Sequence, residues 1–331
     1  MVKSVRSMPK VTIIGNTSWG NTLGALLGDK GITVSLWTRS KDEAEELNLG
    51  QRSYFSTSDI REALNGADLA IWAVPSQKLR ENISQARDYL TDSMLLMSAA
   101  KGLEQSSGKR MSQVLAEEVK PSLRRQICVL SGPNLAAEIA QGLPAASVIA
   151  AQNMAVAEEA RKLMESPQFM TFLDDDIIGV ELSGALKNII ALGAGMIDGL
   201  GLGDNAKGAF IAWGWAEVVS LGVALGAKAG TFYGLAGLGD LITTCSSTLS
   251  RNHYVGYELA KGRPLSKILA SMPHVAEGIA TTAAARLLAK KQKLKLPIIN
   301  LIYSILFEDL PVTRALFKFK RLAANYSLPV A

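Results

Sequence analysis

Six short apolar runs in the first half of the chain constrain its fold more than any other feature. Each has the length of a strand and shows no alternation of apolar and polar residues, and they begin at Val11, Val34, Leu69, Met94, Ile127 and Ala146. Amphipathic stretches such as residues 77–90 and 109–119 lie between them. Strands that are buried on both faces and alternate with helices are typical of parallel sheets. The sequence therefore predicts an α/β domain over residues 1–178, with a mostly parallel sheet and helices on both faces.

The pattern changes after about residue 175. From Val180 onward no convincing pair of strands appears, and helical periodicity dominates. Glycine-rich turns are predicted near residues 199–203 and 234–239, and prolines break the remaining helices at Pro264, Pro273, Pro297 and Pro311. Residues 179–331 are predicted to form a helical domain that binds substrate and carries the catalytic residues.

The charges exclude several classes of partner. The 331 residues carry 35 basic and 30 acidic side chains scattered along the chain, which is typical of a mildly basic surface rather than a nucleic-acid-binding arm. A small anionic substrate suits this balance equally well. Cys128 and Cys245 lie far apart without a C-x-x-C motif, so neither a disulfide framework nor a metal site is predicted.

Two segments bear on where the protein resides. The basic residues 1–10 contain no apolar core of signal-peptide length, which favours a cytoplasmic protein. The apolar stretch 189–239 is interrupted by charged residues well below the roughly 18 apolar residues that a membrane span requires. The interruptions are Asp198, Asp204, Lys207, Glu217 and Lys228. We therefore expect a buried helical core and no membrane span.

The first apolar run leads into the sequence GNTSWG, with Gly15 after the predicted strand and Gly20 before a predicted helix. Dinucleotide-binding loops read G-x-G-x-x-G, where the glycines serve the tight turn, the approach of the diphosphate and the packing of helix on strand. Thr17 stands at the middle position and adds a Cβ there, although its hydroxyl could donate to a phosphate oxygen. A second predicted strand ends at Trp37, within one βαβ unit. We predict a Rossmann-like, dinucleotide-binding domain; the alternative is a plain strand-to-helix turn.

The end of the second predicted strand bears on the type of cofactor. An NAD site places an acidic residue there to bind the ribose 2′-hydroxyl. This chain has Arg39 instead, with Lys41 nearby, and a guanidinium suits a 2′-phosphate. NADP is therefore the predicted cofactor, with NAD as the second choice; the alternative is that Arg39 is a solvated surface residue.

Two further predicted strands end in polar residues. Lys101 follows one strand, and the sequence from Ser131 to Asn134 follows another. Because parallel sheets bind ligands outside the carboxyl ends of their strands, Lys101 is a candidate to hold substrate. The alternative for Lys101 is a lysine at the rim of the cleft, in solvent.

Lys187 is the most informative residue of the second half. Its neighbours one turn away on the predicted helix are small or apolar, namely Ser183, Gly184, Ile190 and Ala191, and no acidic residue lies at helical spacing. Burial lowers the pKa of a lysine, as a general acid and base near neutral pH requires. The two histidines, His253 and His274, are poorer candidates for that role.

Further along, a glycine-rich turn precedes Asp240 and Thr244. The sequence Ser250-Arg251-Asn252 then resembles the start of a helix, where free backbone N–H groups and a guanidinium together form an anion site. Phosphate is the expected ligand; the alternative is a helix cap with a purely local role.

These motifs together resemble the bacterial-type NAD(P)-dependent glycerol-3-phosphate dehydrogenases over essentially the whole chain. The matching segments are residues 15–20, 99–104, 130–146, 178–200, 234–245, 250–252 and 275–282, in the order and spacing of that family. The resemblance implies a Rossmann domain joined to a helical domain. It further implies the reversible NAD(P)H-dependent reduction of dihydroxyacetone phosphate to sn-glycerol 3-phosphate, which feeds glycerophospholipid synthesis, and a homodimer.

The resemblance also implies roles for individual residues. Lys187 would be the proton donor and acceptor, and the catalytic set would be Lys187, Lys101, Asp240 and Thr244. The substrate-binding set would be Lys101, Gly132, Asn134, Lys187, Asn188, Asp240, Ser250, Arg251 and Asn252. The cofactor-binding set would be Gly15, Thr17, Ser18, Trp19, Gly20, Arg39, Lys101, Ala136, Arg251, Val275 and Glu277.

The chain departs from the family pattern at three positions. Glycine is usual where Thr17 stands, Asn21 also differs, and Asn134 replaces a residue that is commonly serine or threonine. Two other functions stay open at this point. One is a reductase related to the β-hydroxyacid dehydrogenases, which the predicted phosphate site at Arg251 disfavours. The other is a non-catalytic NADP-sensing protein, which the substitution at Thr17 keeps open.

Overall fold

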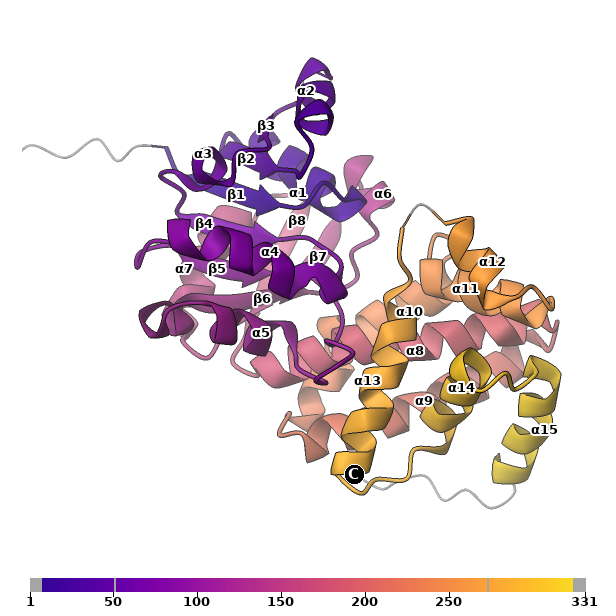
Figure 1. The fold of residues 1–331 in the computed structure, drawn as a ribbon. Helices are drawn as coiled ribbons and strands as arrows, with labels where there is room; N and C mark the ends of the chain where they lie inside the picture. Colours follow the sequence, from indigo (N-terminus) through magenta and orange to yellow (C-terminus); the bar gives the residue numbers. More distant parts are fainter. Residues whose placement is uncertain (1–7, 51, 273, 324–331) are drawn as a thin grey trace, which may run out of the picture.

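A single sheet of eight strands forms the first half of the protein (Figure 1). This computed structural model describes residues 8–50, 52–272 and 274–323. The strand order is β3-β2-β1-β4-β5-β6-β7-β8, and all neighbours run parallel except β6 and β7. The mostly parallel sheet is confirmed, and all six apolar runs lie in strands. The strands are β1 (Lys10–Ile14), β2 (Thr33–Trp37), β3 (Phe55–Thr57), β4 (Leu69–Trp72), β5 (Leu95–Ser98), β6 (Ile127–Ser131), β7 (Ala145–Ala150) and β8 (Phe169–Asp174).

The sequence analysis does not predict two of the strands, β3 and β8, and the reason can be identified for each. β3 has only three residues. β8 lies at the edge of the sheet and alternates, with Phe169 and Thr171 buried and Met170 and Phe172 exposed, so it lacks the unalternating run of the inner strands. The reversal at β7 follows from its short connection to β6, because a five-residue helix is too short to cross back over the sheet.

Helices cover both faces of this sheet, as predicted. Leu23 and Leu27 of α1 and Val156 and Ala160 of α7 pack on one face, together with apolar side chains of β1 and β4. Side chains of α3, α4 and α5 pack on the other face around Trp72. The helices are α1 (Ser18–Asp29), α2 (Lys41–Leu49), α3 (Ile60–Leu64), α4 (Leu79–Ala86), α5 (Met111–Glu118), α6 (Ala136–Ala140) and α7 (Met154–Met164).

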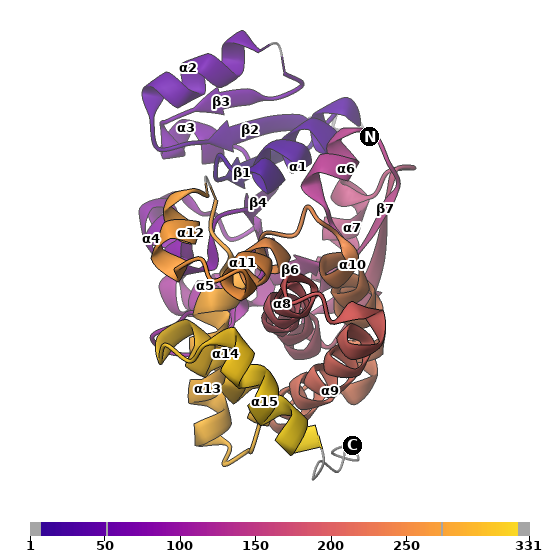
Figure 2. The same cartoon turned by 90° about the vertical axis from the view of Figure 1, so that its right-hand side faces the viewer.

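The described chain after β8 is helical and is built around α8 (Ile177–Gly199), which Figure 2 shows nearly end-on among its neighbours. By length and composition α8 could span a membrane, but 89% of its most apolar window is buried inside the protein, as in a core helix. The other helices are α9 (Gly203–Ala224), α10 (Asp240–Ser246), α11 (Arg251–Ala260), α12 (Leu265–Ala270), α13 (Glu277–Lys291), α14 (Pro297–Phe307) and α15 (Val312–Ala323).

The predicted helix boundaries in this helical part are largely confirmed. Pro264 and Pro297 stand at the starts of α12 and α14, and Pro311 precedes α15. The predicted turn at residues 234–239 is instead one π-helical turn, η5 (Leu235–Gly239), that leads into α10. A Cβ on Gly237 would lie 2.2 Å from the Phe232 carbonyl oxygen, so only glycine allows this packing. Residues 1–7 and Pro273, on which two expectations rested, lie outside the described residues.

Three contacts hold the helical part against the carboxyl edge of the sheet. A Cβ on Gly184 of α8 would lie 2.3 Å from Ser131 Oγ at the end of β6, so the helix approaches the strand closely there. Glu181 of α8 accepts hydrogen bonds from Ser112 and pairs with Arg110, both at the start of α5. These contacts bring α8, and with it Lys187, over the carboxyl ends of the strands.

Candidate active site

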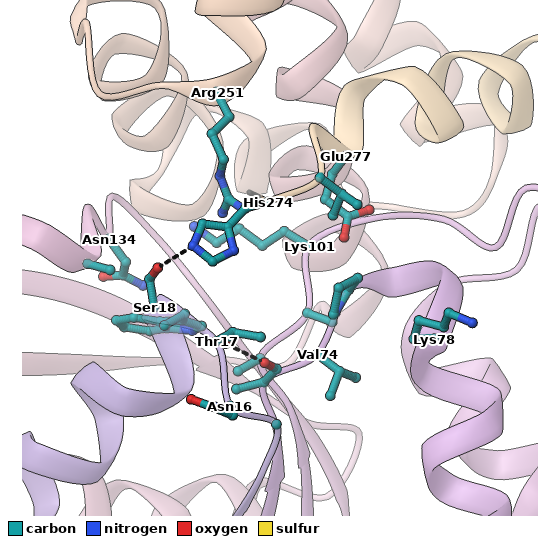
Figure 3. Close-up of a pocket in the computed structure, with 18 of the residues that line it drawn as sticks. Asn16, Thr17, Ser18, Val74, Lys78, Lys101, Asn134, Arg251, His274 and Glu277 are labelled. Carbon is teal, nitrogen blue, oxygen red and sulfur yellow. Dashed lines mark hydrogen bonds between the residues drawn. The ribbon is translucent and has the colours of Figure 1, made fainter. Parts of the chain in front are cut away.

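A cleft of about 720 Å³ lies between the carboxyl edge of the sheet and the helical part. Figure 3 shows Arg251, His274 and Glu277 reaching into it from the helical part, opposite Asn16, Thr17 and Ser18. Most of the predicted site residues line this cleft: Gly15, Thr17, Ser18, Trp19, Arg39, Lys101, Asn134, Ala136, Lys187, Asn188, Thr244, Ser250, Arg251, Asn252, Val275 and Glu277. The other three, Gly20, Gly132 and Asp240, each contact a residue of that set.

The two glycines of the opening loop do what the sequence analysis expected. Gly15 has a φ of +124°, and a Cβ there would lie 2.9 Å from the Ala73 carbonyl oxygen. A Cβ on Gly20 would lie 2.2 Å from the Gly15 carbonyl oxygen, so the helix packs closely on the turn. The N-terminus of α1 therefore opens into the cleft, where helix N–H groups and the helix dipole favour a phosphate.

Thr17 is the N-cap of α1 and has ordinary extended backbone angles, φ −121° and ψ 163°. Its hydroxyl donates to the Ala73 carbonyl oxygen at 2.7 Å and accepts from the Gly20 N–H at 3.0 Å. The suggestion that this hydroxyl donates to a phosphate is therefore wrong for this arrangement, because its single proton is already used. The threonine stabilises the start of the helix and ties it to β4.

The catalytic candidates meet at the buried carboxylate of Asp240, which is only 2% exposed. Lys187 Nζ donates to Asp240 Oδ1 at 2.6 Å, and Lys101 Nζ donates to Asp240 Oδ2 at 2.8 Å. Lys187 also donates to the Thr244 hydroxyl, whose own proton goes to the Asp240 carbonyl oxygen at 2.7 Å. Lys101 donates further to the Gly132 carbonyl oxygen at 2.5 Å. One carboxylate thus holds two lysines in place.

Burial sets the protonation of Lys187, which is 5% exposed. Loss of water around the ammonium lowers its pKa to about 8, Asp240 opposes the shift, and the charge of Lys101 adds to it. Both forms of the amine are therefore accessible near neutral pH, as the sequence analysis anticipated. The acidic partner is 53 residues away in the chain, which explains why no local charge pattern indicated it.

The start of α11 forms a polar corner of the cleft. The Ser250 hydroxyl accepts from the His253 N–H at 3.3 Å and so caps α11, which confirms the predicted helix start. Arg251 lies open to the cleft, yet the surrounding protein displaces enough water to lower its pKa. Asn252 Oδ1 accepts from the Gly278 N–H, and its Nδ2 donates to Asn188 Oδ1, both at 2.9 Å. Because Asn188 Oδ1 accepts from Asn252, the side-chain N–H groups of Asn188 are left to donate to a ligand in the cleft.

Asn134 lines the same cleft and carries a buried acceptor. Its Nδ2 donates at 3.0 Å to Ser147 Oγ, which in turn donates to the Ser131 carbonyl oxygen. These bonds fix the side-chain amide with Oδ1 on the other side, and this buried oxygen has no partner among the described residues. An orphaned buried acceptor at a cleft suits a ligand hydroxyl.

Glu277 joins the two parts of the protein. Its carboxylate accepts from the Ser76 N–H at 2.8 Å and from the Ser76 hydroxyl, and burial raises its pKa. His274 makes a second contact across the cleft, with Nε2 lying 3.3 Å from Ser18 Oγ at the start of α1 (Figure 3). Sequence reasoning missed His274, because a lone histidine in a loop carries no signal of a partner in the other domain.

Arg39 lies half-exposed at the end of β2, with Nη2 3.2 Å from Glu81 Oε1. Lys78 Nζ lies 3.1 Å from the other oxygen of the same carboxylate. Lys78 and then Arg39 hold the pKa of Glu81 below its usual range. Lys41, which the sequence placed near Arg39, pairs instead with Glu45 at 3.6 Å and is not among the described residues lining the cleft.

The described residues contain no group of three or more potential metal ligands. Cys128 and Cys245 are unpaired and buried, and burial raises the pKa of each thiol to about 12. Both cysteines therefore stay protonated near neutral pH.

Comparison with known proteins assigns the chain to a family. Residues 10–157 and 176–317 match the N-terminal and C-terminal models of NAD-dependent glycerol-3-phosphate dehydrogenase. A Dehalococcoides mccartyi protein named glycerol-3-phosphate dehydrogenase (NAD(P)+) is 51% identical, over 97% of this chain and 93% of its own length. A Moorella thermoacetica protein of the same name is 43% identical, over 91% and 92%.

A solved structure shares both the fold and a substantial part of the sequence. The glycerol-3-phosphate dehydrogenase of Coxiella burnetii is 31% identical and superimposes with a TM-score of 0.89, covering 95% of this chain and 99% of that one. Both halves of the sequence and the two-part architecture thus agree with that family. The chain belongs to the family of NAD-dependent glycerol-3-phosphate dehydrogenases.

Proposed function

We propose that this protein catalyses the reversible, NAD(P)H-dependent reduction of dihydroxyacetone phosphate to sn-glycerol 3-phosphate, a precursor of glycerophospholipids. The observation that carries the proposal is the pairing of Lys187 and Lys101 on buried Asp240, in one cleft with Arg251 and the glycine loop. Curated relatives bear the name of this activity.

The proposed cofactor site fits the residues present. The tight turn at Gly15 and the N-terminus of α1 suit a diphosphate, and the surrounding cleft is lined by Trp37, Val74, Pro75 and Ala136. Bound there, the reduced nicotinamide supplies the hydride for the ketone carbon. The site is proposed to lie mainly in residues 1–178, and the catalytic residues mainly in residues 179–331.

Lys187 is proposed to supply the proton. Two of the three N–H bonds of its ammonium are held by Asp240 and Thr244, and the third is available for a substrate oxygen in the cleft. As the ketone oxygen gains negative charge, the ammonium donates its proton, and in the reverse direction the neutral amine removes it. Lys101 and the N–H groups of Asn188 are proposed to stabilise the same oxygen.

The ends of the substrate match the remaining polar groups. Arg251 and the first N–H groups of α11 are proposed to bind the phosphate, and the orphaned Asn134 Oδ1 suits a substrate hydroxyl. Ser250 contributes by capping the helix, and the Gly132 carbonyl oxygen contributes by holding Lys101. Binding energy at the phosphate orients the carbonyl toward Lys187.

A direct assay tests the proposal. Purified protein is mixed with dihydroxyacetone phosphate, and the oxidation of NADPH or NADH is followed by absorbance, with unphosphorylated dihydroxyacetone as the matched substrate. We expect rapid oxidation only with the phosphorylated ketone. A folded protein that binds NADPH but turns over neither ketone would favour the sensing function instead. Residence in the cytoplasm and assembly into a homodimer stay predictions.

The pKa of Lys187 predicts opposite pH profiles for the two directions. Reduction needs the ammonium, so kcat/KM for dihydroxyacetone phosphate should fall as pH rises through about 8. Oxidation needs the neutral amine, so kcat/KM for glycerol 3-phosphate should rise through the same pH. Measuring kcat/KM for both substrates across this pH range checks the assignment. Profiles that bend in the same direction would contradict a single acid–base lysine.

A further inference from the structure

Two cations and one carboxylate meet beside the cleft at the end of β2, and the catalytic proposal does not use them. Arg39 and Lys78 each contact one oxygen of Glu81, at 3.2 Å and 3.1 Å. Arg39 follows β2, whereas Lys78 lies in the 3₁₀ turn η1 (Ser76–Lys78) after β4. Arg39 and Lys78 line the cleft. The three residues Arg39, Lys78 and Glu81 are called the Glu81 cluster below.

The position of the Glu81 cluster identifies the part of a dinucleotide that would lie there. Figure 3 shows Lys78 and Asn134 at opposite sides of the cleft, with the loop at Thr17 between them. A dinucleotide whose diphosphate lies at the start of α1 and whose nicotinamide lies near Lys187 extends its adenosine toward the ends of β2 and β4. The Glu81 cluster therefore borders the adenosine ribose.

The chemistry of the Glu81 cluster favours an anion more highly charged than a carboxylate. Glu81 offers one negative charge to two cations, and all three side chains are about half-exposed, so these ion pairs are weak and easily exchanged. A phosphate monoester carries nearly two negative charges and three acceptor oxygens. It can bond to the guanidinium and the ammonium together, as Glu81 now does.

From this geometry we propose that Lys78 and Arg39 together recognise the 2′-phosphate of NADP(H), and that Glu81 is an internal counter-ion which the phosphate displaces. The inference rests on the proposed function for the presence of a dinucleotide. It adds Lys78 as a residue that determines cofactor specificity. It also predicts that Glu81 lowers the affinity for NADP(H), whereas Arg39 and Lys78 raise it.

Glu43 is an acidic residue that lines the cleft near Asn16 and Thr38. Its Oε2 accepts from the Thr38 hydroxyl and, at 3.4 Å, from Asn16 Nδ2. A carboxylate near the ribose suits the diol of NAD(H) rather than a phosphate. If Glu43 governed recognition, a nucleotide without the 2′-phosphate would bind at least as tightly as one with it.

Isothermal titration with adenosine 2′,5′-bisphosphate and 5′-AMP tests the proposal without any turnover. The wild type should bind the bisphosphate more tightly. Lys78→Gln should weaken bisphosphate binding about tenfold and leave 5′-AMP unchanged, because one charged hydrogen bond is lost. Glu81→Gln should strengthen bisphosphate binding about threefold, because the competing surface ion pairs are removed. Lys41→Gln is the matched control, an exposed lysine that pairs with Glu45, and should change neither affinity.

The outcomes separate this inference from the proposed function. Equal binding of both nucleotides by the wild type, an unchanged Lys78→Gln variant, or weaker bisphosphate binding by Glu81→Gln would overturn the proposal while leaving a dinucleotide cleft intact. A wild type that binds neither nucleotide nor NADPH would overturn the dinucleotide site itself. Circular dichroism of each variant checks that substituting these exposed residues leaves the fold unchanged.

Discussion

Lys187→Ala is expected to lower kcat for the reduction of dihydroxyacetone phosphate by about three orders of magnitude, since general acid–base catalysis contributes about 10²–10⁴-fold. The ammonium of Lys187 is buried beside Asp240 and Thr244 and is the proposed proton donor. Lys101 already donates to both Asp240 and Gly132, so these bonds fix its ammonium and it is not expected to replace Lys187 as the proton donor. The affinity for NADPH should stay unchanged, because the loop at Gly15 and α1 is not altered.

Steady-state kinetics with NADPH oxidation, together with fluorescence titration of NADPH, measure both quantities. Lys290→Ala is the matched control, since Lys290 is an exposed lysine at the end of α13 and lies outside the cleft. The residual activity of Lys187→Ala should also lose the inflection near pH 8, which a purely structural role would not remove. A kcat within tenfold of the wild type, with the inflection retained, would show that another group moves the proton.

The sequence predicted those parts of the fold that depend on local patterns. Unalternating apolar runs identified the inner strands, because both faces of these strands are buried. The same criterion passed over β8, whose Met170 and Phe172 face solvent at the edge of the sheet. The reversed direction of β7 depends on how a short connection packs, and no residue in it carries that information alone.

The residues of the candidate site likewise fall into those that a local sequence pattern predicted and those that only the tertiary fold brings together. Lys187, Arg251 and the glycine loop each stand in an unusual local pattern, so sequence could single them out. Their partners are set by the tertiary fold: Asp240 meets Lys187 across 53 residues, and Ser76 meets Glu277 across 201. In the sequence Thr17 is only a departure from the usual glycine, whereas its bonds to Ala73 and Gly20 are visible only in the folded protein.

Arg251→Ala is expected to lower kcat/KM for dihydroxyacetone phosphate by about 10³-fold and to leave the slow turnover of unphosphorylated dihydroxyacetone unchanged. Each hydrogen bond between a guanidinium and a phosphate contributes about 1.5–3 kcal/mol, and the substitution is expected to remove two of them. Every 1.4 kcal/mol of lost transition-state stabilisation lowers kcat/KM about tenfold. Part of the loss should appear in kcat, because phosphate binding also positions the ketone at Lys187. Steady-state kinetics on both ketones measure the effect.

Two matched variants show whether this loss belongs to phosphate recognition. Arg263→Ala removes an arginine that pairs with Glu258 at 3.0 Å outside the cleft, and it should leave both ketones unaffected. Arg251→Lys keeps the charge without the planar fork and should fall between the wild type and Arg251→Ala. If Arg251→Ala slowed both ketones equally, the guanidinium would act on the shared chemistry or the cofactor. The phosphate would then have to be held by the N-terminus of α11 without Arg251.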